Sequence, residues 1–472
     1  MQIRSLFPIV ALAAMLPISA AHAESQRFAE GVSLGDSLLE VKVADALYRR
    51  DGRWLTLGSR VDSDTRETPY LLLRTAGGDA VASVALAPDD GLSWSPRSIV
   101  PAGNGNDVIV LGIEYDHRDF GALSTLFLAR LDANLGVVWS RHLDAPGLWF
   151  ESPALRERAC ASPMLVAQMQ HNDGGQLDAG DAFLADVNVD TGALISPRSL
   201  GTATGLERAA DAITLDGDAR AVLVETRRDN GAGLESADAI VTFDANGAMV
   251  SNRLVGHAPV VGVRAQSLRL MRDGNSFVLA GRRTSLGPNF FYLHRLAADF
   301  TPAASRTLIP FFNAMDMTVR DGSVLLYGEA NGEVMDRGSV LMRLDADFAI
   351  ALQRRYGTEN QTFPTGALAL GDNGILLALG AMRDEDGFVY ESTFRVLPAT
   401  GEGMLCEEEA YEGFSTGSDA TTTAASWSPT LTTLDVQTTG TAASASSLTR
   451  GDALICSAED ELVFRHDFET ES

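Results

Sequence analysis

Carboxylate side chains are the groups in this sequence best suited to chemistry, because they can bind calcium or act as acid and base in sugar hydrolysis. They gather in stretches that hold Asp62, Asp64 and Glu67; Glu114, Asp116 and Asp119; Asp173, Asp178 and Asp181; Asp229, Glu235 and Asp238; and Asp384, Glu385 and Asp386. A calcium site needs several oxygen ligands at one point, and Asp173, Asp384 and Asp386 are the best candidates. Neither the stretch around Asp173 nor the stretch from Asp384 to Asp386 completes an EF-hand pattern. The alternative is that these carboxylates lie in solvated loops without a metal ion. Calcium is the only cofactor that the sequence suggests.

Aromatic residues form a second group of candidates, because aromatic rings near a concave surface bind sugar rings or peptide side chains. They lie in the segments that should connect one repeat to the next: Trp94, Trp149, Phe150, Phe312 and Tyr356. Packing between neighbouring repeats is the alternative role for each ring. We take these five residues as the ligand-binding candidates.

Arrangements typical of catalysis are scarce. The chain has no G-x-S-x-G elbow, and among 63 acidic residues the mere presence of carboxylate pairs does not identify a glycosidase pair. The stretch from Ala87 to Trp94 (APDDGLSW) is similar to the Asp box of sialidases, with Ala in place of the leading Ser, but it occurs once and without a visible arginine cluster. We therefore assign no catalytic residue and favour a non-enzyme.

The elements that carry these residues repeat along the chain. One marker position returns at spacings of 56, 56, 56, 53, 48 and 52 residues, at Arg74, Arg130, Asp186, Thr242, Arg295, Arg343 and Arg395. Asp-Gly and Asn-Gly pairs, which tolerate positive φ, indicate hairpins at 51–52, 216–217, 321–322 and 373–374. Four antiparallel strands per unit predict an all-β protein, a seven-bladed β-propeller, with six or eight blades or stacked sandwiches as alternatives. In a propeller the acidic and aromatic segments share one face.

One strand–turn–strand pattern resembles a known group of proteins. The stretch Ala129 to Trp139 (ARLDANLGVVW) resembles the repeats of secreted bacterial propellers with pyrroloquinoline-quinone-like or related blades, which favour an Asp-x-x-Gly-x-x-x-Trp turn. The resemblance covers about residues 40 to 410, and only the second unit carries the Trp. It implies a fold rather than an activity. In the related stretch Val340 to Phe348, Asp345 is expected to bond to the backbone of the turn.

The two ends of the chain differ from the repeats. Met1 to Ala23 has a basic start, an apolar core and a small-x-small site at its end, which indicates a signal peptide and a secreted or periplasmic protein. We expect the propeller over 24–411 and a Ser/Thr-rich β or extended C-terminal segment over 412–472. The acidic-aromatic ending from Leu462 to Glu469 has no assigned role.

Three cysteines are present, Cys160, Cys406 and Cys456. In an oxidising compartment we expect Cys406 and Cys456 to form a disulfide that ties the C-terminal segment back, while Cys160 is a small buried hydrophobe.

A formal charge of −26 disfavours nucleic acid and anionic membranes as partners, and no further segment approaches the length of a membrane span. We expect a monomer. The sequence favours a non-catalytic binding or scaffold propeller whose protein or carbohydrate ligand is unknown. A sialidase-like glycoside hydrolase at the acidic aromatic rim and a cell-surface adhesion protein are the alternatives.

Overall fold

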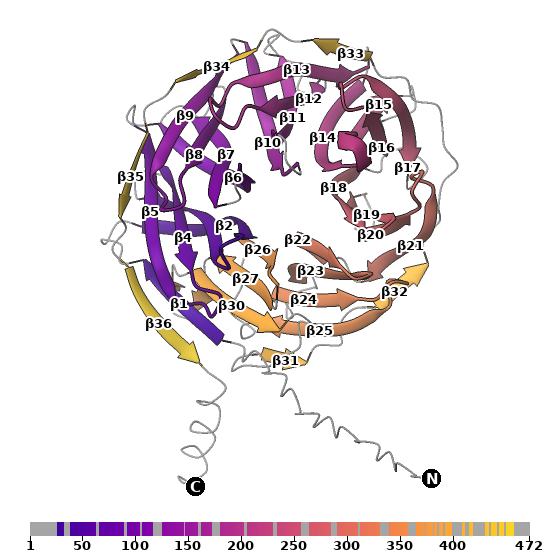
Figure 1. The fold of residues 1–472 in the computed structure, drawn as a ribbon. Helices are drawn as coiled ribbons and strands as arrows, with labels where there is room; N and C mark the ends of the chain where they lie inside the picture. Colours follow the sequence, from indigo (N-terminus) through magenta and orange to yellow (C-terminus); the bar gives the residue numbers. More distant parts are fainter. Residues whose placement is uncertain are drawn as a thin grey trace, which may run out of the picture.

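The computed structural model shows a ring of β-sheets (Figure 1). We call the space around the ring axis, which the innermost strand of each blade faces, the central channel. It describes residues 26–32, 38–62, 66–88, 92–103, 106–116, 125–145, 147–158, 162–171, 180–202, 205–229, 234–255, 264–284, 290–309, 312–330, 339–356, 365–372, 374–380, 382–384, 387–389, 392–398, 408–410, 415–418, 430–433, 436–440, 443–447 and 450–456. The predicted signal peptide, Cys160 and Cys406 lie outside these ranges. Within them, no helix is long and apolar enough to cross a membrane.

The described strands form seven four-stranded antiparallel blades, as the repeats predicted. Blades 1 to 3 are β2(Leu38–Tyr48), β3(Trp54–Asp62), β4(Glu67–Arg74), β5(Ala80–Pro88); β6(Ser93–Ala102), β7(Asp107–Tyr115), β8(Thr125–Leu131), β9(Val137–Asp144); and β10(Leu148–Arg156), β11(Met164–His171), β12(Gly180–Val187), β13(Leu194–Gly201). Blades 4 and 5 are β14(Gly205–Thr214), β15(Arg220–Asp229), β16(Leu234–Phe243), β17(Met249–Val255); and β18(Arg264–Asp273), β19(Ser276–Thr284), β20(Phe290–Leu296), β21(Pro302–Ile309). Blade 6 is β22(Phe312–Arg320), β23(Ser323–Ala330), β24(Ser339–Leu344), β25(Ile350–Tyr356).

Blade 7 closes the ring with a strand from the other end of the chain. Its inner strands are β26(Thr365–Leu370), β27(Gly374–Gly380) and β30(Ser392–Pro398), and its fourth strand is the N-terminal β1(Gln26–Val32). A small ribbon of β28(Met382–Asp384) and β29(Gly387–Val389) follows β27, and one 3-10 turn, η1(Asp216–Asp218), follows β14. Pairing of β1 with β30 joins the first and last parts of the propeller, which prevents the ring from opening at that point.

The C-terminal segment wraps around the outside of the ring, where Figure 1 shows it in yellow and pale orange. Its strands add a fifth strand to six blades in descending order, blades 6, 5, 3, 2, 1 and then 7: β31(Glu408–Ala410), β32(Ser415–Ser418), β33(Thr430–Thr433), β34(Gln437–Gly440), β35(Ala443–Ser447) and β36(Arg450–Cys456). We call these six strands the belt. Because outer strands otherwise expose unpaired backbone groups, the belt protects the edges of those blades.

Hydrophobic cores lie between the blades, one at each of the seven boundaries. Alternate residues of one strand belong to different cores: Val108 and Val110 of β7 pack toward blade 1, whereas Ile109 and Leu111 pack toward blade 3. A blade is therefore buried on both faces, which explains why its strands have continuous apolar sequences rather than alternating ones.

Several boundaries depend on a glycine that faces an aromatic ring on the next strand. Gly58 pairs with Tyr70, Gly112 with Phe127 and Gly281 with Tyr292. A Cβ added at Gly112 would lie 2.2 Å from the Phe127 ring and 2.4 Å from the Ser95 carbonyl oxygen. The absent side chain makes room for the ring.

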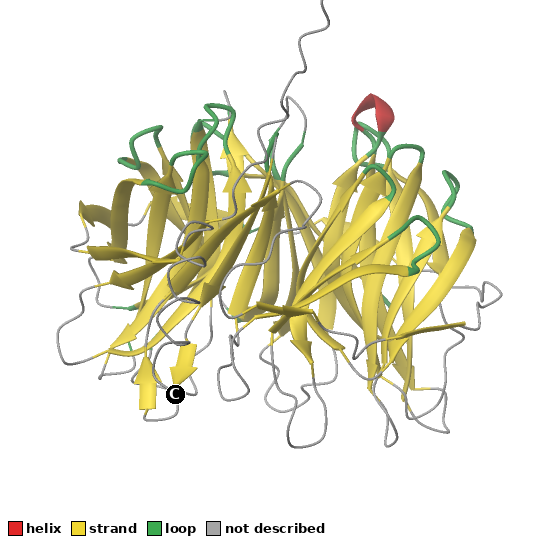
Figure 2. Ribbon diagram, turned by 90° about the horizontal axis from the view of Figure 1, so that it is seen from below, coloured by secondary structure: helices red, strands yellow, loops and turns green. Residues whose placement is uncertain are grey.

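The short turns, η1 among them, lie together on one face of the ring (Figure 2). In the turn between β24 and β25, Asp345 Oδ1 accepts hydrogen bonds from the backbone N–H groups of Asp347, at 2.9 Å, and Ala349, at 2.8 Å, which confirms the role predicted for Asp345. Phe348 ends this turn with φ of 61° and is fully buried, as Leu135 is, with φ of 68°, in blade 2. Burial of these side chains offsets an unfavourable backbone conformation.

Arginines on this face connect each blade to the turn of the next. In each case the arginine side chain donates a hydrogen bond to a backbone carbonyl oxygen of the next blade. The pairs are Arg49 with Ala133 (3.1 Å), Arg130 with Val189 (3.1 Å), Arg198 with Gly247, Arg253 with Asp299 (2.9 Å), Arg295 with Ala346 (2.9 Å) and Arg320 with Gly371 (3.1 Å). The chain of contacts covers six successive boundaries, from blades 1 and 2 to blades 6 and 7. Arg130 and Arg295, two of the repeated marker residues, thus have a structural role, which is to connect neighbouring blades.

Candidate functional site

The innermost strands of blades 1 to 6 each contain a β-bulge near their middle. The bulged residues include Ala44, Arg97, Ser152, Leu268 and Met315, and a bulge of this kind re-aims the neighbouring side chains. The bulged strands of blades 1, 2, 3, 5 and 6 contribute side chains to one cavity in the central channel.

The residue after the bulge joins its blade to the next in four cases. In these four cases the side-chain oxygen accepts a hydrogen bond from a backbone N–H group of the next blade. The pairs are Asp45 Oδ2 with Ile99 (2.9 Å), Ser98 Oγ with Leu155 (2.8 Å), Asp211 Oδ2 with Leu270 (2.8 Å) and Asp316 Oδ2 with Leu368 (2.8 Å). These contacts join blades 1 to 2, 2 to 3, 4 to 5 and 6 to 7. Blades 3 and 5 carry Ala154 and Arg269 at this position.

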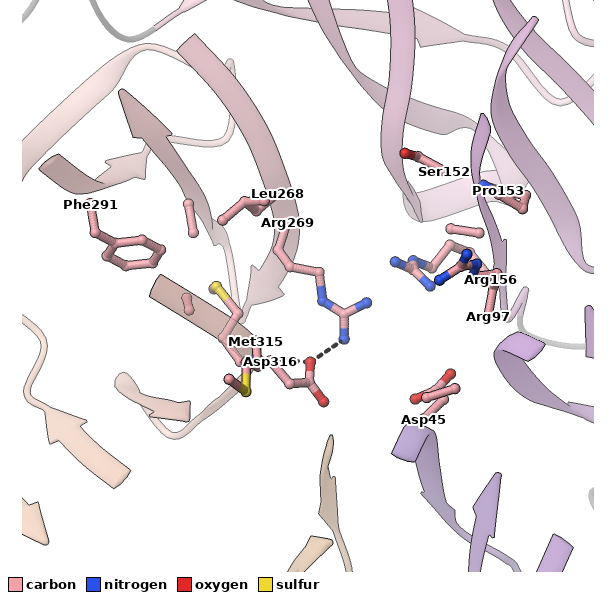
Figure 3. Close-up of a pocket in the computed structure, with 15 residues that line it drawn as sticks. Asp45, Arg97, Ser152, Pro153, Arg156, Leu268, Arg269, Phe291, Met315 and Asp316 are labelled. Carbon is pink, nitrogen blue, oxygen red and sulfur yellow. Dashed lines mark hydrogen bonds and ion pairs between the residues drawn. The ribbon is translucent and has the colours of Figure 1, made fainter. Parts of the chain in front are cut away.

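Three arginines point toward the same central space (Figure 3). Arg156 pairs with Asp211 across the boundary of blades 3 and 4, and Arg269 donates to Asp316 Oδ1 at 2.9 Å. Arg97 is exposed in the channel, and it makes no hydrogen bond or ion pair with any residue that the structure describes. A guanidinium carries five donors, and this one is available to a ligand as far as the described residues are concerned.

A cavity of about 240 Å³ occupies this part of the channel. Its polar walls are Asp45, Arg97, Ser152, Arg156, Arg269 and Asp316, and its apolar walls include Pro153, Phe291 and Met315. Ser152 adopts φ of 48° and is exposed, a conformation that is unfavourable for a residue with a Cβ and that clusters at ligand-binding positions.

The electrostatics of the channel are set by burial and by the close carboxylates. Burial raises the pKa of Asp45 to about 6, and repulsion from Asp316 adds to the increase, against the attraction of Arg269. Burial alone would lower the pKa of Arg269, but Asp316, Asp211 and Asp45 outweigh it and hold that pKa above its usual value. Arg269 is therefore charged, whereas Asp45 titrates near neutrality.

A second cavity, of about 310 Å³, adjoins the first between blades 1 and 2 and shares Ala44 and Arg97 with it. At its centre Glu67 Oε1 accepts hydrogen bonds from Ser59 Oγ at 2.5 Å and Ser95 Oγ at 3.0 Å, while Oε2 accepts one from Tyr115 at 3.0 Å. Burial raises the pKa of Tyr115 above its usual range, and the neighbouring Glu67 carboxylate raises it further. Tyr115 is thus a neutral hydrogen-bonding group here.

Two of the five aromatic candidates are fully buried. Trp94 stacks on Phe127, with ring centroids 4.3 Å apart, and donates from Nε1 to Glu114 Oε2 at 2.7 Å. Phe150 contacts Phe183 edge-on, at 5.1 Å. Both have the packing role that was considered as the alternative. Trp149 is half-buried, and its Nε1 is without a partner among the described residues.

The remaining candidates are placed only in part. Phe312 begins β22, Tyr356 ends β25 and pairs with Glu408, and Asp384 ends β28 opposite Gly387, but their side chains are outside the description. Asp173 and Asp386 lie outside the described residues. Among the other acidic residues of these stretches, Glu67, Glu114 and Asp238 are buried in strands and are not part of a solvated rim. Among the described residues no group of three or more metal-ligating side chains was found. The calcium hypothesis stays a prediction.

Sequence reasoning did not identify the channel residues. Arg97, Arg156 and Arg269 have no common spacing with the acidic loops or the aromatic connections. A signal was available only for Arg97, a charged residue within an otherwise buried strand, which costs free energy unless the residue faces a partner or a cavity.

Comparison with known proteins finds distant structural likenesses alone. No protein-family model and no curated protein matches the chain. Among solved structures it is similar to the polysaccharide lyase Uly1 (TM-score 0.47, 10% identity, 75% of this chain and 90% of that one). It is also similar to the β-propeller domain of the Trilobed protease from Pyrococcus furiosus (0.44, 9%, 79% and 96%) and to the phage phi92 endosialidase (0.42, 10%, 82% and 71%). At these values the likenesses carry no argument about activity, and a relation to pyrroloquinoline-quinone-like repeats stays a hypothesis.

Proposed function

We propose that this protein is an exported, non-catalytic binding propeller that holds the carboxylate group of a ligand in its central channel. The observation that supports this most is Arg97, an exposed guanidinium without a described hydrogen-bond or ion-pair partner, on the wall of a cavity into which Arg156 and Arg269 also point. Guanidinium groups bind carboxylates through paired, charge-assisted hydrogen bonds.

The charges of the site favour an anion over a cation. Arg156 and Arg269 are each already paired with a carboxylate, whereas Arg97 has no ion pair with any of the residues that the structure describes. Asp45, the remaining carboxylate of the cavity, accepts backbone N–H groups at both oxygens, from Ala46 and Ile99. An anionic group of a ligand bound at Arg97 would supply this guanidinium with a partner of opposite charge.

Binding can be tested by calorimetric titration with small carboxylates, each compared with its uncharged amide. The carboxylate is expected to bind at least about 10-fold more tightly than the amide, and Arg97→Gln should weaken it by about 10- to 100-fold, the effect of a charge-assisted contact. Arg50→Gln is the matched control, because Arg50 is exposed in the turn that follows β2 and does not line the cavity. Equal affinities for carboxylate and amide, or an unchanged affinity of Arg97→Gln, would refute the proposal.

Sugar hydrolysis is a second candidate function, and the titration of Asp45 is what favours it. A carboxyl group with a pKa of about 6 is suited to general acid catalysis. This function requires turnover of a glycan, lost in Asp45→Asn. A broad panel of glycosides with no product formed would exclude it and leave the binding function in place.

A further inference from the structure

We infer that the ligand is a carboxylated saccharide, whose acidic group lies in the channel at Arg97 and whose hydroxyl groups occupy the adjoining cavity around Glu67. This inference rests on the proposed function, and it assigns the class of ligand. It depends on the second cavity, which the proposed function does not use.

The two cavities adjoin each other at two shared lining residues. Arg97 and Ala44, the bulged residues of β6 and β2, line both. A ligand whose carboxylate contacts Arg97 therefore extends directly into the space between blades 1 and 2. The combined space suits a small ligand with one acidic and one polar, uncharged part, within the usual size range of binding pockets.

Three hydroxyl oxygens of the second cavity can accept hydrogen bonds from a ligand, and the cationic side chain of Lys42 also lines this cavity. Ser59, Ser95 and Tyr115 each give their only hydroxyl proton to Glu67. A hydroxyl group has one donor and two acceptor lone pairs, so these three oxygens can only accept further hydrogen bonds. The Glu67 side chain is buried, and it fixes the three hydroxyl groups in this orientation.

The spacing of these acceptors favours adjacent hydroxyl groups over peptide groups. Ser59 and Ser95 bond to the same oxygen of Glu67, so their own oxygens lie close together. Neighbouring hydroxyl groups of a sugar ring supply closely spaced donors, whereas an extended peptide supplies one N–H per residue, with successive residues about 3.3 Å apart and alternating in direction. An apolar ring would offer no donor to the remaining acceptor lone pairs of these oxygens, which already donate to Glu67.

Three probes separate the ligand classes: D-glucuronate has both the acidic group and the ring hydroxyl groups, cyclohexanecarboxylate keeps the acid on a ring without hydroxyl groups, and D-glucose lacks the acid. We expect glucuronate to bind about 10-fold or more tightly than either of the others, as two or three additional hydrogen bonds would produce. Ser95→Ala and Tyr115→Phe should reduce the ratio of glucuronate to cyclohexanecarboxylate affinity several-fold. Ser251→Ala, on the exposed outer strand β17, should leave the ratio unchanged.

The outcomes distinguish this inference from the function on which it rests. Equal binding of glucuronate and cyclohexanecarboxylate, or tighter binding of an acidic peptide, overturns the saccharide and leaves the carboxylate site. Equal binding of glucose and glucuronate overturns the carboxylate site and leaves the hydroxyl-binding cavity. Absence of saturable binding of all probes up to ~10 mM, which corresponds to an affinity weaker than about −3 kcal/mol, overturns both.

Discussion

Arg269 of blade 5 donates a hydrogen bond of 2.9 Å to Asp316 of blade 6, and the other oxygen of the same carboxylate accepts one of 2.8 Å from the backbone of blade 7 at Leu368. One side chain thus joins three blades at the wall of the channel. The contact leaves Arg269 charged and directed toward the central space, where it contributes to the field that a bound anion would experience.

Replacement of Asp316 by Ala should lower the free energy of unfolding by about 3–5 kcal/mol, because it leaves Arg269 without its ion-pair partner in the channel. Urea unfolding followed by fluorescence measures this change. Asp347→Ala, which removes an exposed carboxylate from a turn of the same blade, is the control and should change stability by at most about 0.5 kcal/mol. Equal effects of the two substitutions would contradict the connecting role of Asp316.

Gly112→Ala should destabilise the protein by about 1–3 kcal/mol, because the added methyl group would overlap the Phe127 ring and the Ser95 carbonyl group. Gly77→Ala is the matched control, since the nearest atom to its Cβ would be 3.9 Å away. The melting temperatures of the two variants decide the matter. A Gly112→Ala protein as stable as Gly77→Ala would show that the blade boundary relaxes freely.

Asp45 should make stability depend on pH in a defined window. Its pKa is about 6 in the folded protein against an ordinary value of 3.8, so between about pH 4 and 6 the folded state binds more protons than the unfolded state. Stability therefore falls as pH rises through this window, and the loss is complete above the folded pKa, at up to about 2–3 kcal/mol. Unfolding of the wild type and of Asp45→Asn at about pH 4 and 7 isolates the effect. Parallel pH profiles would contradict it.

A disulfide between Cys406 and Cys456 remains a prediction, because Cys406 and the side chain of Cys456 are outside the described residues. The belt begins two residues after Cys406, on blade 6, and ends at Cys456, on neighbouring blade 7. Mass spectrometry of exported material should find these two cysteines linked, and their replacement by Ser should cost about 4 kcal/mol in the chain-entropy model. Cys160→Ser should cost less. Free thiols at both positions would exclude the bond.

The number of blades, the hairpins and the role of Asp345 could be predicted because they depend on local chemistry. A strand pattern, an Asp-Gly pair or an aspartate that bonds to its own turn acts within a few residues, and seven copies reinforce the interpretation. The residues of the candidate site could not be predicted in this way. Trp94 and Phe150 have the composition of a binding surface but are buried, whereas Arg97 became a candidate only when a bulge placed it on the channel wall.

The sequence by itself determined the repeating unit, since alternation, turn residues and apolar strands encode one blade at a time. The tertiary structure decided how the blades close and what meets at the centre. Pairing of β1 with β30 and the descending course of the belt join residues hundreds of positions apart, and such pairings depend on which sheet edges remain free once the ring has formed. The convergence of Arg97, Arg156 and Arg269 has the same origin, because three blades present them to a common axis that no single repeat contains.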